Sequence, residues 1–210
     1  MAPGAQDEMA KYTEILRAHT SQQGIPVTEL IVFKLKEPAT DATTSVFESK
    51  IFANANKAKG LLKAAWGNSL SDPRTLIWMM NWDKIESHWE FWQTDDFLPV
   101  MEGISDLFVE GRPLVRHYRF DPTGFLESEW MRVIVFDQGT KCDAEKLLNE
   151  KTSAVGCKAR KGGFAIDMGE DTWFCAMVTY DNKEQAEWYT VGSLEGVENH
   201  LVKLSFSFAI

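Results

Sequence analysis

Leu76-Ile77-Trp78-Met79-Met80-Asn81-Trp82-Asp83-Lys84-Ile85-Glu86 is the most informative stretch of this 210-residue sequence. Residues 75–82 are apolar at both odd and even positions, which predicts a strand that is covered on both faces. The following residues fit a capping box, in which the Asp83 carboxylate accepts from first-turn N–H groups and Glu86 reaches back, so a helix begins there. Its helical spacing places Ile85, His88, Trp89 and Trp92 on one face.

A second strand-to-helix passage repeats the first. Residues 179–184, Thr-Tyr-Asp-Asn-Lys-Glu, match residues 81–86, Asn-Trp-Asp-Lys-Ile-Glu, with an aromatic, an Asp and a Glu in the same places. Residues 133–136 match residues 30–33 in the same order along the chain. Two anchors in one order predict an internal duplication. The alternative to a duplication is that any two α+β stretches look alike at this level of detail.

The remaining pattern predicts two α+β units. We expect a first helix over residues 7–20, then strands over 29–36, 75–82, 113–120, 131–136, 162–166, 172–180 and 204–210. Further helices are expected over 44–63, after 83, over 143–154 and after 181, with a strand or loop over 64–69. Each half then reads βαββαβ, the ferredoxin-like unit. The predicted domains are an N-terminal helical extension (1–26), a first repeat (27–121) and a second repeat (129–210), joined through the turn at residues 121–124.

Each such unit has helices on one face of its sheet only. Because residues 75–82 are apolar on both faces, the uncovered face needs a partner, and the second unit of the same chain can supply it. At about 25 cal/mol per Å² of apolar area, leaving that face in water costs many kcal/mol. We therefore predict two sheets packed face to face.

Residues 76–89, followed by Phe97 and Pro99, resemble the dimeric α+β barrel superfamily. The nearest likenesses are the antibiotic-biosynthesis monooxygenase-like and stress-responsive barrel proteins, here in a fused tandem form over about residues 27–210. The resemblance implies an intramolecular dimeric α+β barrel with an extra N-terminal helix. The superfamily includes cofactor-free oxygenases of aromatic polyketides, polyketide cyclases, haem-degrading enzymes, chlorite dismutase relatives and members without known activity. It therefore implies a fold more strongly than a function.

Composition excludes several classes of protein. The chain carries 22 basic and 31 acidic residues, a net charge of −9, without a basic stripe, which argues against nucleic acid and anionic membranes as partners. Cys142, Cys157 and Cys175 give neither a disulfide framework nor a zinc pattern. No secretory signal and no membrane span are apparent, so we expect a cytoplasmic protein.

Histidines and arginines are the candidate catalytic groups. His88, on an aromatic helix face, is a candidate acid or base, and the alternative is a histidine packed at a helix–sheet interface. His117 and Arg119 share one face of their predicted strand and can hold a carbonyl or an enolate, unless that face is solvent-exposed. His19 and His200 are explained by helix ends. The candidate substrate-binding residues are Trp78, Trp82, Trp89, Trp92, Asn81, Arg116 and Tyr118.

The sequence shows no site for a metal or a phosphate. No carboxylate cluster has metal-ligand spacing, and the glycines after Lys161 are not followed by Gly-Lys-Ser/Thr. His88 or His117 is an available haem ligand, but nothing selects haem over another flat ligand. We expect no cofactor.

The favoured hypothesis is an enzyme of secondary metabolism that acts without cofactor on an aromatic or polyketide-like intermediate. The reaction is cyclisation, isomerisation, dehydration or monooxygenation. The alternative is a non-catalytic ligand-binding or stress-responsive barrel protein, and a module that interacts through exposed Trp is a third reading. A small apolar or aromatic ligand is the expected partner, and the sequence leaves a homodimer open.

Overall fold

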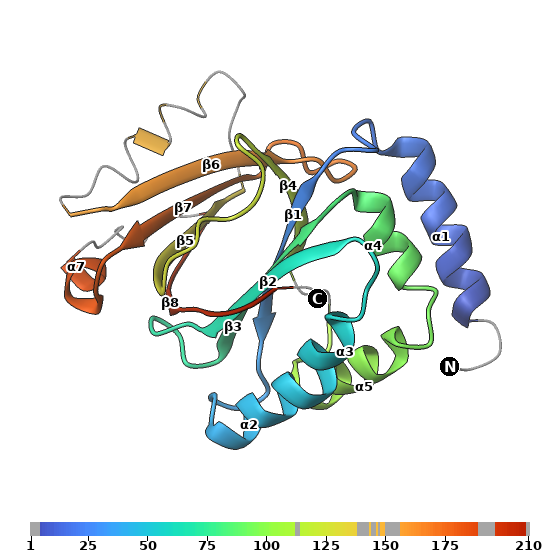
Figure 1. Ribbon diagram of the computed structural model, residues 1–210, viewed down its shortest axis with the longest axis horizontal. Helices are drawn as coiled ribbons and strands as arrows, with labels where there is room; N and C mark the ends of the chain where they lie inside the picture. The colour runs from blue at the N-terminus through green and yellow to red at the C-terminus, as the bar shows by residue number, and fades with distance from the viewer. Residues whose placement is uncertain are drawn as a thin grey trace.

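A computed structural model describes residues 5–111, 114–137, 156–188 and 196–208, with 143, 146, 148 and 149. Its strands form one antiparallel sheet in the order β8-β5-β7-β6-β4-β1-β3-β2-β9 (Figure 1). The strands are β1 (Val27–Lys34), β2 (Leu61–Asn68), β3 (Thr75–Trp82), β4 (Leu114–Phe120), β5 (Trp130–Phe136), β6 (Ala159–Ala165), β7 (Phe174–Tyr180), β8 (Val197–Lys203) and β9 (Ser205–Phe208). The helices are α1 (Ala5–His19), α2 (Asp41–Val46), the π-helical segment η1 (Phe47–Phe52), α3 (Ala53–Ala55), α4 (Ile85–Phe91), α5 (Phe97–Leu107) and α7 (Lys183–Trp188).

The prediction of two separate sheets was wrong: the strands form one continuous sheet, which curls until its two ends nearly meet. The first four strands lie in the order β4-β1-β3-β2 and the next four in the order β8-β5-β7-β6. β4 pairs with β6, which joins the two sets. β9 follows β8 directly along the chain and pairs with β2, while β8 pairs with β5. One stretch of chain therefore bridges the two ends of the sheet.

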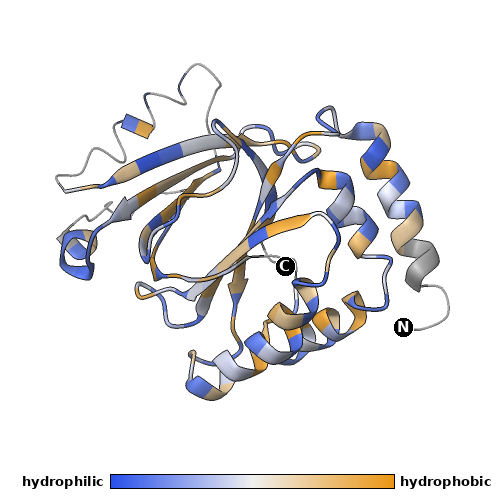
Figure 2. Cartoon of the chain, viewed as in Figure 1, coloured by the Kyte–Doolittle hydropathy of each residue, from blue (hydrophilic) through white to orange (hydrophobic). Residues whose placement is uncertain are grey.

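Two apolar layers bury both faces of β3, as the alternation of residues 75–82 predicts. Trp78 and Met80 pack on the outer face beneath the helices, whereas Ile77 and Met79 point into the interior of the curled sheet. In Figure 2, the helices below the sheet carry both hydrophobic and hydrophilic residues, as helices with one buried face do. In Figure 1, α2, α3 and α5 lie below the sheet, whereas α4 lies to its right, next to α1.

The predicted helix over residues 44–63 was too long. Helical structure ends at Ala55, and β2 begins at Leu61. Gly60 between them has φ +82, a conformation that favours glycine, and a Cβ there would lie 2.4 Å from Asp83 Oδ1. The close approach of the α4 start, which no local pattern reveals, ends the helical segment early.

The predicted closing strand over residues 204–210 was incomplete. Residues 197–203, interpreted as the end of a helix, form β8. His200 therefore does not lie at a helix end: it is buried, with Nδ1 3.1 Å from Ser69 Oγ. Pairing with β5, a tertiary contact, overrides the local pattern.

The capping box at the start of α4 was also wrong. Asp83 Oδ1 accepts from the Ser87 hydroxyl at 2.6 Å. Glu86 reaches away from its own helix, and its carboxylate accepts from the Gly24 N–H at 2.9 and 3.1 Å. Glu86 therefore ties the segment after α1 to α4.

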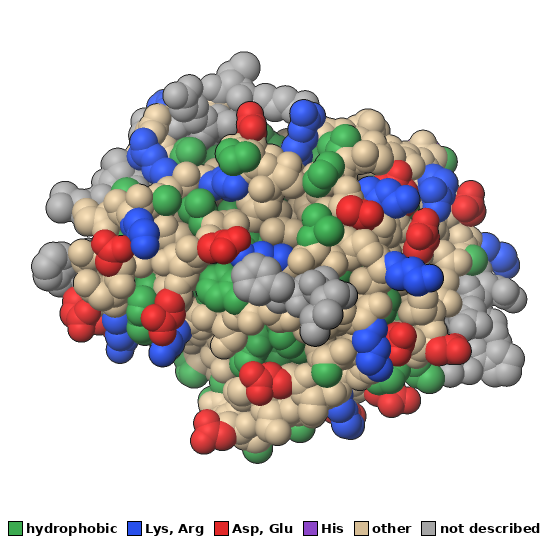
Figure 3. All heavy atoms as spheres, viewed as in Figure 1, with side chains coloured by type: hydrophobic (Ala, Val, Ile, Leu, Met, Phe, Trp, Pro, Cys, Tyr) green, Lys and Arg blue, Asp and Glu red, His purple; other side chains and the backbone are tan. Residues whose placement is uncertain are grey.

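Some predictions concern residues that the structure does not describe. Most of the helix predicted over 143–154 lies outside the described residues, as does Cys142. None of the helices in the described ranges is long and apolar enough to cross a membrane. Figure 3 shows acidic and basic side chains interspersed over the visible face.

Candidate functional site

A cavity of about 270 Å³ lies between α1 and the outer face of the sheet, and we call it the α1 pocket. Its walls are Tyr12, Leu16, Thr20, Ile85, Trp89, Trp92, Val115, His117, Asp167 and Met168. The residues from α1 form one side, and those from α4 and β4 form the other. The pocket is therefore mostly apolar and aromatic with one histidine and one carboxylate, a composition typical of small-molecule sites.

Asp167 holds His117 at two points. Its Oδ2 accepts from the His117 backbone N–H at 2.6 Å, and its Oδ1 lies 2.8 Å from His117 Nδ1. The Ile166 N–H donates to the His117 carbonyl at 2.9 Å, so β4 itself positions the carboxylate. The Asp167 side chain is 22% exposed and that of His117 is 4% exposed. Asp167 is therefore the group of this pair that is more open to the pocket.

His88 contacts His117 from α4. His88 Nδ1 lies 2.9 Å from His117 Nε2, and the Trp92 indole N–H donates to His88 Nε2 at 2.8 Å. An indole N–H is a donor only, so Nε2 of His88 carries no proton and the neutral ring has its proton on Nδ1. His88 then donates to His117, and His117 donates through Nδ1 to Asp167. Both ring nitrogens of each histidine are engaged.

Glu29 ends this chain of groups inside the protein. It lies opposite His117 in the β1–β4 pairing, and its Oε2 is 3.4 Å from His88 Nδ1. The Trp82 indole N–H donates to the same oxygen at 2.8 Å. Glu29 is 1% exposed. We call Asp167, His117, His88 and Glu29 the proton chain.

The proton chain has shifted pKa values. Burial raises the pKa of Glu29 to about 7, although the His117 charge and the Trp82 hydrogen bond act in the opposite direction. Burial, followed by the nearby His117, lowers the pKa of His88 well below its usual range. Burial alone would lower the pKa of His117, but the charge and hydrogen bond of Asp167, with Glu29, raise it. Groups with opposed shifts in one cluster are typical of proton-transfer sites.

Glu29, His88 and His117 also have the spacing of metal ligands. Their donor atoms lie within 4.8 Å of one another, and they form the one such group found in the described residues. Two imidazoles with one carboxylate is a donor set that iron uses. However, the proton on His88 Nδ1 occupies the lone pair that a cation needs, because Trp92 holds Nε2 as the acceptor. The groups as arranged fit a hydrogen-bond chain better than a metal centre.

The structure separates the predicted tryptophans into two groups. Trp89 and Trp92 line the α1 pocket, whereas Trp78 and Trp82 are buried in the outer core. Asn81, at the end of β3, accepts from the Thr28 hydroxyl at 2.8 Å.

The predicted arginines and Tyr118 lie apart from His88. Arg119 is exposed and donates to Gln22 at 3.3 Å, beside a different cavity. Arg116 is buried, pairs with Glu170 at 2.9 Å and lies over the Trp173 ring at 3.4 Å. Tyr118 points into the interior of the curled sheet. Its burial there is the main reason that its pKa lies well above the usual range.

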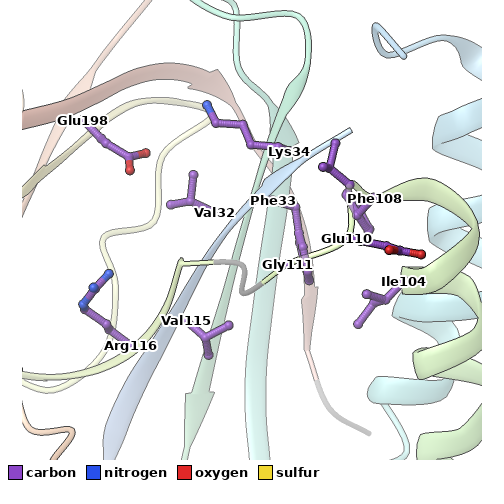
Figure 4. A pocket seen from close by; sticks show the side chains of 11 residues that line it. Val32, Phe33, Lys34, Ile104, Phe108, Glu110, Gly111, Val115, Arg116 and Glu198 are labelled. Atoms are coloured by element: carbon purple, nitrogen blue, oxygen red, sulfur yellow. The ribbon is translucent and has the colours of Figure 1, made fainter. Parts of the chain in front are cut away.

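A second cavity, of about 380 Å³, lies at one end of β1 and β4. Figure 4 shows Arg116, Glu198 and Lys34 on one side of it and Phe33, Phe108 and Ile104 on the other. Neither of the two paired histidines lines it. The α1 pocket is therefore the better candidate for chemistry.

Sequence reasoning missed Asp167 and Glu29. Asp167 directly follows the strand predicted over 162–166, and an acid at a strand end is a weak signal on its own. Glu29 stood within a predicted strand, between Thr28 and Leu30. A ferredoxin-like order pairs the first strand with the fourth, which places Glu29 beside His117, as the register shows.

Replacing Glu29 by Gln tests the raised pKa through stability. The folded-state pKa, about 7, exceeds the ordinary 4.5, so between these values the folded state binds a proton that the unfolded state lacks. Wild-type stability therefore falls as pH rises from 4.5 to 7, by on the order of 3 kcal/mol from this group. Glu29→Gln lacks this slope, so its unfolding free energy rises relative to wild type over that window in denaturant titrations.

Asp72→Asn is the matched control. The Thr75 hydroxyl and the Arg74 N–H lower the pKa of Asp72 to about 2, so its effect on stability is constant above about pH 5. A wild-type minus Glu29→Gln difference that is flat between pH 4.5 and 7 would contradict the assignment.

No protein-family model and no curated protein matches the chain. Solved structures do match it. An anthrone oxidase-like protein superposes with a TM-score of 0.65 at 11% identity, over 88% of this chain and 93% of its own. A candidate monooxygenase from Lactobacillus acidophilus NCFM superposes with a TM-score of 0.58 at 12% identity, over 88% of this chain and 97% of its own. A second candidate monooxygenase, from Fusobacterium nucleatum, superposes with a TM-score of 0.60 at 10% identity, over 88% of this chain and 95% of its own. At these identities the likeness establishes the fold: a mixed α/β chain around a nearly closed antiparallel sheet.

Proposed function

We propose that this protein is an oxidative enzyme that binds an aromatic small molecule in the α1 pocket and needs no bound cofactor. The observation that carries the proposal is the His117–Asp167 pair in an aromatic pocket, backed by His88 and Glu29. The names of the structural neighbours favour oxidation among the reactions that the sequence left open. Secondary metabolism is the setting that aromatic, polyketide-like substrates suggest.

Proton removal from an activated carbon is the first step. The Asp167 carboxylate takes the proton, and His117, which donates to Asp167 through Nδ1, orients the carboxylate. The apolar walls formed by Trp89 and Ile85 keep water away from the carbanion. Cyclisation, isomerisation and dehydration can begin with the same proton transfer.

Molecular oxygen then completes the reaction. The carbanion transfers its electrons to O₂ and forms a carbon–peroxide bond. The peroxide takes up a proton and water is lost, which leaves a carbonyl, so a CH₂ group and O₂ give C=O and H₂O. No external reductant is required.

We also propose that residues 27–121 and 129–210 are two ferredoxin-like repeats. The two sets of four strands share one relative order, with the fourth-first-third-second arrangement in each. This supports an internal duplication, with residues 1–26 as an extension. The α1 pocket then belongs to the first repeat, except for Asp167 and Met168.

Incubation with an anthrone in air tests the function. We expect O₂ consumption and quinone formation in equal amounts, unchanged by a metal chelator and absent without O₂. An anthrone is the probe because a structural neighbour is named for that reaction. Conversion no faster than without protein, for this and other activated aromatic substrates, would contradict the proposal. Saturable binding without conversion would favour a non-catalytic ligand-binding protein instead.

A further inference from the structure

We infer that Trp92 is a positioning residue: its indole N–H fixes which nitrogens of His88 and His117 carry protons and thereby opposes the protonation of His117. Trp92 follows α4 by one residue and lines the α1 pocket. It therefore contacts both the space for a ligand and the proton chain. The inference concerns proton positions, and it rests on the proposed function only in its consequence for turnover.

The first step is the contact between Trp92 and His88. Trp92 Nε1 lies 2.8 Å from His88 Nε2, and an indole can only donate. His88 Nε2 must therefore present a lone pair. The ring proton is on Nδ1, where it faces His117 Nε2 at 2.9 Å and Glu29 Oε2 at 3.4 Å.

The second step follows from the contact between the histidines. His117 Nε2 accepts from His88, so the single proton of His117 is on Nδ1, which donates to Asp167 at 2.8 Å. A second proton, on His117 Nε2, would point at the His88 N–H. Two N–H groups that face each other across 2.9 Å repel, so the Trp92 hydrogen bond disfavours the imidazolium form of His117.

The surroundings of His117 otherwise favour the imidazolium. Asp167 from the segment after β6 and Glu29 from β1 are the acidic groups that face it, and His88 of α4 is the third titratable neighbour. Tyr12 of α1 and Thr20, the residue after α1, line the same pocket. Both carboxylates act to raise the pKa of His117, against the effect of burial. Removing the Trp92 N–H lets His88 move its proton to Nε2 and accept from a protonated His117.

Trp92 also links this proton arrangement to the pocket. Its ring stacks on Tyr12 of α1, with centroids 6.4 Å apart and planes inclined by 18°. A ligand that displaces the indole from His88 releases the constraint on His117. Pocket occupancy and the basicity of His117 are then coupled through one hydrogen bond.

Trp92→Phe tests the inference, because it keeps an aromatic ring against Tyr12 and removes the N–H donor. Nitrogen-15 NMR of the imidazoles reports tautomer and charge directly. In the wild type we expect His88 as the Nδ1–H tautomer, and a neutral His117 that carries its single proton on Nδ1. In Trp92→Phe we expect the midpoint of His117 titration to rise by about one pH unit or more.

Trp89→Phe is the matched control. Trp89 lines the same pocket, but within the described residues its indole donates to neither histidine, so its replacement leaves both titrations at wild-type positions. A wild-type His88 that is protonated at Nε2, measured without any variant, would overturn the inference. So would an unchanged His117 midpoint in folded Trp92→Phe. If the spectra behave as expected and no substrate turns over, the inference stands and the proposed function fails.

Discussion

Asp167→Asn lowers kcat by about 10²- to 10⁴-fold, with KM for an aromatic substrate close to the wild-type value. The amide lacks the charge that accepts the substrate proton. The amide oxygen can still accept from the His117 backbone N–H, as Oδ2 does at 2.6 Å, so the fold is retained. The amide NH₂ then faces His117 Nδ1, 2.8 Å from the present oxygen, and forces the His117 proton to Nε2, opposite the His88 N–H. Steady-state kinetics of O₂ consumption measure the effect.

Asp171→Asn is the control for this variant. Asp171 lies four residues further along the same segment but lines a different cavity, beside Arg119. We expect wild-type kcat and KM. An Asp167→Asn enzyme with undiminished kcat would show that proton removal does not pass through Asp167, and the mechanism would need another base.

Trp82→Ala lowers the free energy of unfolding by about 3–5 kcal/mol. The side chain is fully buried in the outer core and stacks on His88, with ring centroids 5.0 Å apart. Its removal leaves a cavity, and it also deprives Glu29 Oε2 of its N–H donor at 2.8 Å. Denaturant titration at pH 7 measures the loss.

Trp82→Phe separates the two causes. Phe fills most of the volume but has no N–H, so the loss falls to about 1–3 kcal/mol, the cost of a buried acceptor without its donor. The same variant should be less affected at pH 5, where Glu29, with a pKa raised to about 7, is protonated. A Trp82→Ala protein within about 1 kcal/mol of wild type would contradict this account of the core.

Periodicity predicted the elements whose burial repeats regularly. Residues 75–82 alternate between two apolar layers, and β3 has those bounds. Strict alternation along β4 places His117 toward the helices and its neighbour Tyr118 in the interior. β8 failed because its pattern, with His200 in its middle, lacks a regular period and depends on pairing with β5.

The proton chain could be predicted only in part. His88 and His117 were recognisable as titratable groups in apolar surroundings, but they lie 29 residues apart and meet through the packing of α4 on the sheet. Asp167 comes from the far side of the predicted linker, 50 residues after His117. No local pattern carries such contacts, because the β4–β6 pairing alone brings Asp167 to β4.

The bridging stretch made by β8 and β9 has a consequence during synthesis on the ribosome. β2 pairs with β3 along one edge and with β9 along the other. The ribosome adds the residues of β9 about 140 residues after those of β2. Until then β2 presents a free edge, and Gly67 lies where a Cβ would meet the Lys203 carbonyl at 2.3 Å. In the nascent chain, the free edge of β2 can therefore pair with the edge of another chain. This exposure ends when β9 is synthesised and pairs with β2.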